Sequence, residues 1–214
     1  MATQITAVTF DVGGVLVDWN PRHLYRELFR GDEAAMERFL AEVVDHDWNA
    51  RLDAGYPFAQ AVAELSVAHP DRAEMIAAYH DRWLDMLGGS FDGTVAIMRE
   101  LRSAGVPVYG LSNWSAETFP GTKARFPFLD ELDGILISGD AGVGKPDPAI
   151  FREFLRRFAL TPQTTVFIDD WDYNIAAARS LGMVALHFVD AGRLRADLRG
   201  LGLPLAAEAE PTVA

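Results

Sequence analysis

Four short polar segments, far apart in the sequence, carry side chains suited to phosphoryl transfer. They are residues 10–14 (FDVGG), 111–113 (LSN), 144–147 (GKPD) and 167–170 (FIDD). Three of them directly follow an apolar run of the kind that forms a β-strand. Open α/β sheets bind ligands just beyond the carboxyl ends of their strands, so we expect these groups to converge on one magnesium-dependent site.

Asp11 is the candidate nucleophile. A carboxylate at the end of a strand can attack phosphorus and form an aspartyl-phosphate, which divides one difficult step into two easier ones. Gly13 and Gly14 follow, and they allow the backbone to turn tightly and to approach a ligand closely. The alternative is structural: a strand that ends in an aspartate and a glycine turn.

Asp169 and Asp170 form an adjacent pair of carboxylates that would lie near Asp11 at one edge of a sheet. Three unneutralised carboxylates repel one another, and at least one pKa rises. A divalent cation removes this repulsion, and Mg²⁺ binds one or two carboxylates together with water and phosphate oxygens. The alternative is a solvated acidic turn that caps the helix beginning near Asn174.

Ser112, Asn113 and Lys145 are the candidate phosphate-binding residues. A hydroxyl and nearby N–H groups hold phosphoryl oxygens without adding charge, and the Lys145 ammonium could pair with Asp11. Three carboxylates and a phosphate dianion carry about −5, against about +3 from Mg²⁺ and the lysine, which makes binding feasible. Ser112 could instead cap a helix, and Lys145 could be an exposed loop residue.

The order of the predicted elements indicates an α/β fold. Helical apolar spacing recurs, with no strand in between, at 21–30, 33–44, 57–67 and 73–87. Strands are expected at 7–10, 106–111, 135–138, 165–168 and 184–189. Further helices are expected at 94–103, 116–125, 148–158, 174–181 and 193–201. Strand–helix alternation predicts a parallel sheet that is covered on both faces.

This pattern divides the chain into three parts. The parallel-sheet core is expected at 1–18 and 90–202, an all-helical insertion at 19–89, and a flexible tail at 203–214. Substrate choice in such an architecture comes from the inserted part closing over the core. Insertion residues between two predicted helices that could face the opening are Trp48, Asn49, Arg51 and Tyr56, although Trp48 could instead pack in the core of the insertion. Tryptophans that closely follow a polar segment, and could either line the site or support its loops, are Trp19, Trp114 and Trp171.

Composition excludes several classes of function. The chain has 214 residues, no cysteines and a net charge of −12. It therefore has no disulfides, thiolate zinc sites or cysteine nucleophiles, and its charge argues against nucleic acid as a partner. With no signal peptide and no apolar stretch that could span a bilayer, we expect a cytoplasmic monomer or homodimer whose partner is a small-molecule phosphate ester.

Taken together, the four segments resemble those of the haloacid dehalogenase (HAD) superfamily, in the same order and over essentially the whole chain. The most specific parts are residues 144–148 (GKPDP) and 167–174 (FIDDWDYN). The resemblance implies a Rossmann-like core, a small type-1 helical cap formed by the insertion, and a phosphatase-like hydrolase.

The resemblance also implies roles for individual residues. Asp11 would be the nucleophile, Ser112 a phosphoryl ligand and Lys145 its charge partner. Asp11 and Asp170 would bind Mg²⁺ directly, with a backbone carbonyl from Val12 or Gly13, and Asp169 would act through water. The substrate-binding set is then Gly13, Ser112, Asn113 and Lys145.

One departure from the family pattern concerns residue 13. HAD phosphatases usually carry a second aspartate two residues after the nucleophile, which protonates the leaving group, and this chain has Gly13 there. General acid catalysis contributes typically ~10²–10⁴-fold. Candidate substitutes are Asp18, in the linker to the cap, and His46 or Asp47 in the cap.

Three functions follow as hypotheses. The first is a Mg²⁺-dependent phosphatase that acts on a small phosphomonoester, such as a sugar phosphate, through Asp11. The second is a 2-haloacid dehalogenase with the same nucleophile, because a halide leaves without protonation and Gly13 is then no handicap. Against it, dehalogenation needs no metal, and Asp169 and Asp170 would repel a haloacid carboxylate. The third is a catalytically weak phosphate-binding protein.

Overall fold

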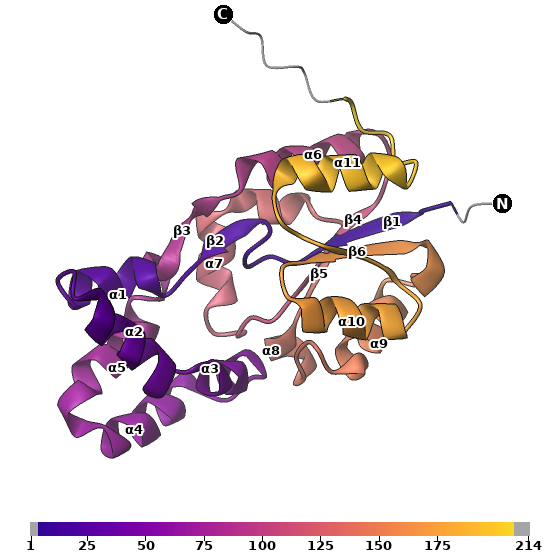
Figure 1. The fold of residues 1–214 in the computed structure, drawn as a ribbon. Coiled ribbons are helices and arrows are strands. Elements are labelled where there is room, and N and C mark those ends of the chain that lie inside the picture. The colour runs from indigo at the N-terminus through magenta and orange to yellow at the C-terminus, as the bar shows by residue number, and fades with distance from the viewer. Residues whose placement is uncertain (1–3, 208–214) are drawn as a thin grey trace, which may run out of the picture.

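A parallel sheet forms the centre of the fold, as the computed structural model of residues 4–207 shows (Figure 1). Within these residues the sheet has the strand order β5-β4-β1-β6-β7. The bounds are β1 Ala7–Phe10, β4 Val108–Ser112, β5 Gly134–Ile137, β6 Thr165–Asp169 and β7 Val184–His187. The fold class predicted from the sequence, a Rossmann-like α/β sheet, is confirmed.

Helices cover both faces of this sheet. In Figure 1, α6 (Asp92–Ser103) and α11 (Ala191–Gly200) lie above it, and α9 (Pro148–Arg157) and α10 (Asp172–Ser180) lie below. The strands are accordingly apolar and buried on both sides, with every residue of β1 and β6 buried. Because the strands are packed on both faces, the positions of their ends are fixed.

The register of the strands places the polar segments side by side. Phe10 pairs with Gly110 on one side and with Ile168 on the other, in parallel. Asp11 therefore follows β1 at the level where β4 ends in Ser112 and β6 ends in Asp169. The convergence predicted from the sequence is a consequence of this register.

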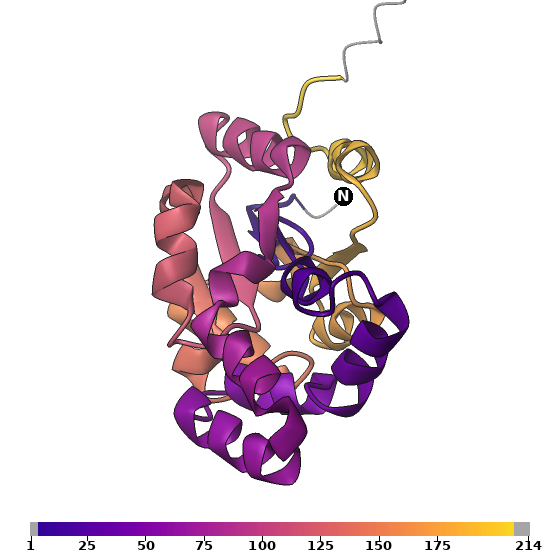
Figure 2. The same cartoon turned by 90° about the vertical axis from the view of Figure 1, so that its left-hand side faces the viewer.

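The insertion forms a helical cap at the carboxyl end of the sheet, at the lower left of Figure 1 and in front in Figure 2. Its helices are α1 (Arg22–Leu28), α2 (Glu33–Glu42), α3 (His46–Asp53), α4 (Phe58–Ala68) and α5 (Ala73–Asp81). Helix α3 was not predicted, because its sequence is mostly polar. It is started by Asp45, whose side chain accepts a hydrogen bond from the Trp48 N–H at 2.8 Å.

A pair of short antiparallel strands joins the cap to the core. Strand β2 (Val17–Trp19) pairs with β3 (Leu87–Ser90). The predicted helix 73–87 was therefore too long: α5 ends at Asp81, a 3₁₀ turn spans Trp83–Met86, and the chain is extended from Leu87. The domain boundaries near residues 18 and 90 stay a prediction.

The shorter connecting elements complete the description. They are the helices α7 (Phe119–Arg125) and α8 (Ser138–Ala141) and the 3₁₀ turns Pro70–Arg72, Pro127–Glu131 and Pro162–Thr164. No helix within residues 4–207 is long and apolar enough to cross a membrane.

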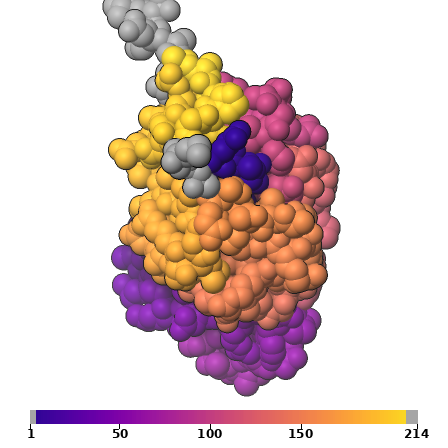
Figure 3. Space-filling model, turned by 90° about the vertical axis from the view of Figure 1, so that its right-hand side faces the viewer, coloured from indigo at the N-terminus to yellow at the C-terminus, as the bar shows by residue number. Residues whose placement is uncertain are grey.

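The described part of the predicted tail is packed rather than loose. Leu203 and Leu205 are buried, and the Ala206 N–H donates to the Glu100 carboxylate on α6. Figure 3 shows this side of the molecule, with the C-terminal segment in yellow beside the indigo start of the chain. The prediction of a flexible tail was wrong for residues 203–207, and 208–214 lie outside the described residues.

Candidate active site

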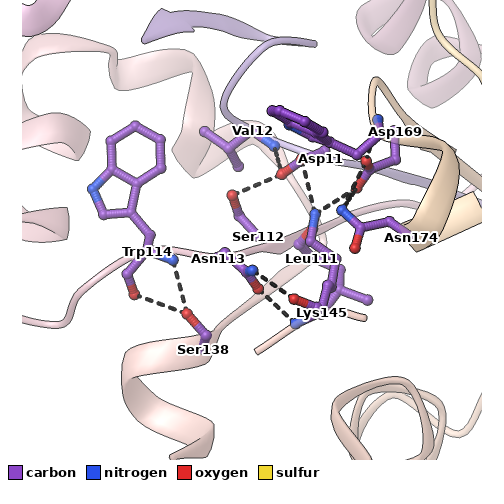
Figure 4. A network of polar contacts seen from close by, with 11 residues as sticks. Asp11, Val12, Leu111, Ser112, Asn113, Trp114, Ser138, Lys145, Asp169 and Asn174 are labelled. Atoms are coloured by element: carbon purple, nitrogen blue, oxygen red, sulfur yellow. Dashed lines mark hydrogen bonds and ion pairs between the residues drawn. The ribbon is translucent and has the colours of Figure 1, made fainter. Parts of the chain in front are cut away.

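A cavity of about 390 Å³ lies between the carboxyl edge of the sheet and the cap. Both parts of the chain line it. The core contributes Asp11, Gly13, Gly14, Ser112, Asn113, Trp114, Lys145, Asp170, Trp171, Tyr173 and Asn174. The cap and its connection contribute Trp19, Asn20, Pro21, Arg22, Leu40, Val44, Asp45, His46, Asn49, Asp53, Tyr79 and Trp83. The polar residues at its base form one network (Figure 4).

Asp11 is held at the base of the cavity and is only 6% exposed. Its Oδ1 accepts hydrogen bonds from the Ser112 hydroxyl and the Val12 N–H, both at 2.7 Å, and its Oδ2 pairs with the Lys145 ammonium at 2.8 Å. Burial raises the pKa of Asp11 to about 8 against the opposing effect of Lys145, and the Asp169 carboxylate raises it further. The carboxylate is therefore oriented but needs positive charge nearby to stay ionised.

Lys145 is buried and uses all three of its ammonium hydrogens. It donates to Asp11, to Asp169 Oδ2 at 2.7 Å and to the Leu111 carbonyl at 3.0 Å. Burial would lower the pKa of Lys145, but the two carboxylates outweigh this effect and raise it. The alternative of an exposed loop lysine is excluded.

Asn113 holds the backbone on either side of the Lys145 Cα. Its Oδ1 accepts from the Lys145 N–H at 2.7 Å, and its Nδ2 donates to the Lys145 carbonyl at 2.9 Å. We expected this amide to bind substrate. In the structure both polar atoms of this amide instead bond the Lys145 backbone, an arrangement that helps to fix the loop carrying the ammonium. A direct contact between Asn113 and a phosphoryl group stays a prediction.

Asp169 lies beneath the cavity, completely buried, and is the most heavily hydrogen-bonded of the carboxylates. The Asn174 amide donates to Oδ1 at 2.9 Å and to Oδ2 at 3.1 Å, and the Trp171 N–H donates to Oδ1 at 2.9 Å. Asn174 was noted only as part of a motif and not as a site residue. Its place in the first turn of a helix, five residues after Asp169, was the available signal.

The donor set fits a hard divalent cation. Asp11, Asp169 and Asp170 each offer an oxygen, and these oxygens lie within 4.8 Å of one another. Within residues 4–207, Asp170 Oδ1 is buried and has no hydrogen-bond partner. An unsatisfied buried carboxylate oxygen is costly, and a cluster made only of oxygen ligands suits Mg²⁺ or Ca²⁺. The residues present could therefore bind such a metal.

Gly14 leaves room for the Asp170 carboxylate, because it has no Cβ, and this yields a testable prediction. Its φ is +77°, and a Cβ on residue 14 would lie 2.5 Å from Asp170 Oδ2. We expect Gly14→Ala to lower the free energy of unfolding by about 1 kcal/mol, because alanine is strained at positive φ. We also expect it to weaken Mg²⁺ binding severalfold by displacing the carboxylate, as measured by calorimetry.

Gly105→Ala is the matched control for this prediction. Gly105 has a φ of +80°, but a Cβ there would meet nothing within 4 Å. The control should show the loss of stability and retain the Mg²⁺ affinity of the wild type. Equal Mg²⁺ affinity in Gly14→Ala and the wild type would contradict the assignment of Asp170 to the metal site.

The three residues proposed to replace the general acid that is missing at Gly13 lie in different surroundings. Asp18 is paired with His23 at 2.9 Å, and Asp47 is exposed and does not line the cavity. His46 does line the cavity, but it is exposed and stacks near Trp171 with ring centroids 6.1 Å apart. None of the three is a buried acid that faces the site.

Four tryptophans line the cavity. The tryptophans Trp19, Trp114 and Trp171, whose role was left open, line it together with Trp83. Of the four cap residues expected at the opening, only Asn49 lines the cavity. Trp48 packs edge-on against Tyr79 in the cap interior, and Arg51 lies over the Tyr56 ring. Trp48 therefore packs in the core of the cap, the alternative given above, and the expectation of a place at the opening was wrong for Arg51 and Tyr56.

Comparison with known proteins gives a consistent result. Residues 5–182 match the family described as haloacid dehalogenase-like hydrolase. A sesquiterpene phosphatase from Aspergillus oryzae is 28% identical over 206 residues, covering 94% of this chain and 98% of that protein. A phosphoserine phosphatase from Thermus thermophilus is 39% identical over 138 residues, which cover 63% of this chain and 53% of that protein.

Solved structures with the same fold include two kinds of enzyme. A HAD family enzyme from Bacteroides thetaiotaomicron, in complex with magnesium and inorganic phosphate, has a TM-score of 0.66 at 22% identity, with coverage of 87% of this chain and 95% of that one. An L-2-haloacid dehalogenase has a TM-score of 0.61 at 20% identity, with coverage of 87% and 85%. At these identities the likeness establishes the fold alone.

Proposed function

Because this chain belongs to the haloacid dehalogenase-like hydrolase family, we propose that it is a Mg²⁺-dependent phosphatase that hydrolyses a small phosphomonoester through Asp11. One observation carries the proposal. Three clustered carboxylates lie at the base of a cavity: Asp11 and Asp169 share the buried Lys145 ammonium, and Asp170 has a buried oxygen with no partner within residues 4–207. Such a cluster needs another cation, and it then attracts a phosphate dianion.

The metal would be held by Asp11 and Asp170, with Asp169 acting through water. Hydrogen bonds from Lys145, Asn174 and Trp171 already reach Asp169, which supports the indirect role. The Val12 carbonyl accepts from two backbone N–H groups, those of Leu16 and Val17, so Gly13 is the better source of a carbonyl ligand. Bound Mg²⁺ would neutralise phosphoryl charge and keep Asp11 ionised at neutral pH.

The chain's own residues would perform the displacement. The Asp11 carboxylate attacks phosphorus, and the ester oxygen leaves on the opposite side. The Ser112 hydroxyl and the Lys145 ammonium, both now bonded to Asp11, would turn partly to the phosphoryl oxygens and stabilise their charge. Water then attacks the phosphorus of the aspartyl-phosphate and regenerates Asp11.

The side chains that line the cavity favour particular classes of substrate. Indole rings of Trp19, Trp83 and Trp114 offer apolar faces that can pack on the carbon skeleton of an alcohol, including the C–H face of a sugar. A sugar phosphate fits this description. The sesquiterpene phosphatase among the relatives supports a more apolar alcohol as well. Both classes therefore belong in a substrate screen.

Dehalogenation is the second candidate function, and Gly13 favours it, because halide departure needs no proton donor. The acidic cluster opposes it. A 2-haloacid carries its own carboxylate, which Asp169 and Asp170 would repel, and the one buried ammonium nearby is already shared by two carboxylates. A catalytically weak phosphate-binding protein would bind Mg²⁺ and phosphate without turnover.

Phosphate release tests the proposal. We expect the purified protein to release phosphate from an aryl phosphate and from at least one sugar or isoprenoid monophosphate. EDTA should abolish this release and excess Mg²⁺ should restore it, because the acidic cluster needs the cation. Chloride release from 2-chloropropionate that survives EDTA, without phosphate release, would establish dehalogenation instead. Mg²⁺ and phosphate binding without turnover would favour the weak phosphate-binding protein.

A further inference from the structure

Asp53 is a buried acid in the cavity that the mechanism above does not use. It is the last residue of α3 and is 9% exposed. It lines the cavity together with Asp11 and Lys145, and the Lys145 charge acts on its carboxyl group. A buried ionisable group in a cavity requires an explanation, because an isolated buried charge is costly.

The backbone of Asp53 is fixed to the core. Its carbonyl accepts a hydrogen bond from the Ser138 hydroxyl at 2.5 Å, and the same hydroxyl oxygen accepts from the Trp114 N–H at 2.9 Å. Ser138 follows β5 and Trp114 follows β4. The end of α3 is thus tied to the segments that follow β4 and β5, so the position of Asp53 is set by the core.

The carboxyl group of Asp53 is also oriented. The Asn49 amide donates to Oδ2 at 2.9 Å, and Asn49 Oδ1 accepts from the Tyr79 hydroxyl at 2.7 Å. These hydrogen bonds link Tyr79 of α5 through Asn49 to Asp53 of α3 inside the cap, and Asp53 lines the cavity. Such a chain of hydrogen bonds holds a side chain in one rotamer, as a group that transfers a proton requires.

The protonation state of Asp53 suits proton transfer near neutral pH. Burial raises the pKa of Asp53 to about 7, while the Asn49 amide and the Lys145 ammonium act in the opposite direction. Tyr79 and Lys145 are ionisable groups near it, and burial keeps Tyr79 neutral by raising its pKa. A general acid works best when its pKa lies close to the operating pH.

We propose that Asp53 is the general acid and base of this enzyme, in place of the aspartate that is missing at Gly13. The inference rests on the proposed phosphatase function. Asp11 attacks from the core, so the leaving oxygen lies on the opposite side of phosphorus, toward the cap. Asp53 is a carboxyl group that the cap places in this cavity and that Asn49 holds in position.

As Asp11 bonds to phosphorus, the ester P–O bond breaks and its electron pair goes to the leaving oxygen. Protonated Asp53 gives its proton to that oxygen, which departs as an alcohol. In the second step the Asp53 carboxylate takes a proton from the attacking water, and the aspartyl P–O bond breaks to release phosphate.

Leaving groups of different basicity test this role. We expect Asp53→Asn to lower kcat/KM for an alkyl phosphate by about 10²-fold or more, since an alkoxide cannot leave without a proton. For p-nitrophenyl phosphate, whose leaving group departs as an anion, the loss should stay within about 3-fold, because the proton donor contributes little. Asp47→Asn, an exposed position on the same helix, is the control and should leave both rates unchanged.

Two further measurements do not depend on the activity of that variant. In the wild type, kcat for the alkyl phosphate should fall above pH 7, while kcat for p-nitrophenyl phosphate should not fall there. The melting temperature of Asp53→Asn relative to the wild type should rise from pH 5 to pH 8. Burial disfavours the ionised Asp53 carboxylate in the folded wild type but not in the unfolded chain. The folded wild type therefore loses stability as the pH rises toward the raised pKa of Asp53, and the asparagine variant does not.

The role of Asp53 and the phosphatase function can be overturned by different results. Equal losses on both substrates, or no loss on the alkyl phosphate, would overturn the role of Asp53 and leave the phosphatase in place. A melting-temperature difference that does not change between pH 5 and pH 8 would also overturn it. No phosphate release by the wild type from either substrate would overturn both proposals.

Discussion

Replacing Asp11 with asparagine should lower kcat for phosphate release on the order of 10⁴-fold or more, as expected for loss of a covalent nucleophile. The amide has nearly the shape of the carboxylate and can keep the hydrogen bond from Ser112. It cannot form the aspartyl-phosphate. Phosphate release should be measured at saturating Mg²⁺ with the best substrate of the screen.

The Asp11→Asn variant should remain folded, because it removes a charge from a buried site without creating a cavity. Far-ultraviolet circular dichroism and thermal unfolding provide this control. Mg²⁺ affinity should also fall, since Asp11 supplies one of the three clustered carboxylates. Retention of more than a tenth of the wild-type kcat by a folded variant would contradict the nucleophilic role of Asp11.

Replacing Lys145 with alanine should have the largest effect on stability. The ammonium lies between Asp11 and Asp169, and removal of one partner from a buried ion pair typically costs about 3–5 kcal/mol, because it leaves uncompensated charge. Chemical unfolding in EDTA measures this cost without compensation by a bound metal. In Mg²⁺, kcat should fall about 10²–10³-fold through loss of a phosphoryl contact.

The chain provides a matched control, because Lys123 is its one other lysine. Lys123 pairs with Asp130 at the surface, with its side chain 37% exposed. Lys123→Ala should change the free energy of unfolding by less than about 1 kcal/mol, as for exposed ion pairs, and should leave kcat unchanged. Similar losses of stability in the two variants would contradict the assignment of Lys145 as the internal cation of the site.

Much of the site could be predicted from the sequence because a parallel sheet brings its strand ends together. The apolar runs before Asp11, Ser112 and Asp169 are buried strands, and the parallel register makes their next polar residues neighbours. Lys145 lies in a loop, and its place between Gly144 and Pro146, together with the charge balance of the site, indicated its role.

The cap side of the site could not be predicted in the same way. No local sequence pattern shows which face of a helical insertion covers the core. Arg51 and Tyr56 were for this reason expected at the opening, but they lie away from it. Helix α3 has few apolar residues, and its end was taken for a loop. Asp53 was missed for this reason, since its position depends on contact with Ser138, which only the folded chain brings close to it.

In the proposed reaction, Asp11 carries the phosphoryl group during turnover. Mass spectrometry of protein quenched in acid during steady-state hydrolysis of a phosphomonoester would detect this covalent intermediate. We predict one phosphoryl group on the peptide that contains Asp11, lost when the substrate is exhausted and absent in Asp11→Asn. Sustained turnover with no phosphoryl group on that peptide, or with the group on another residue, would contradict the claim.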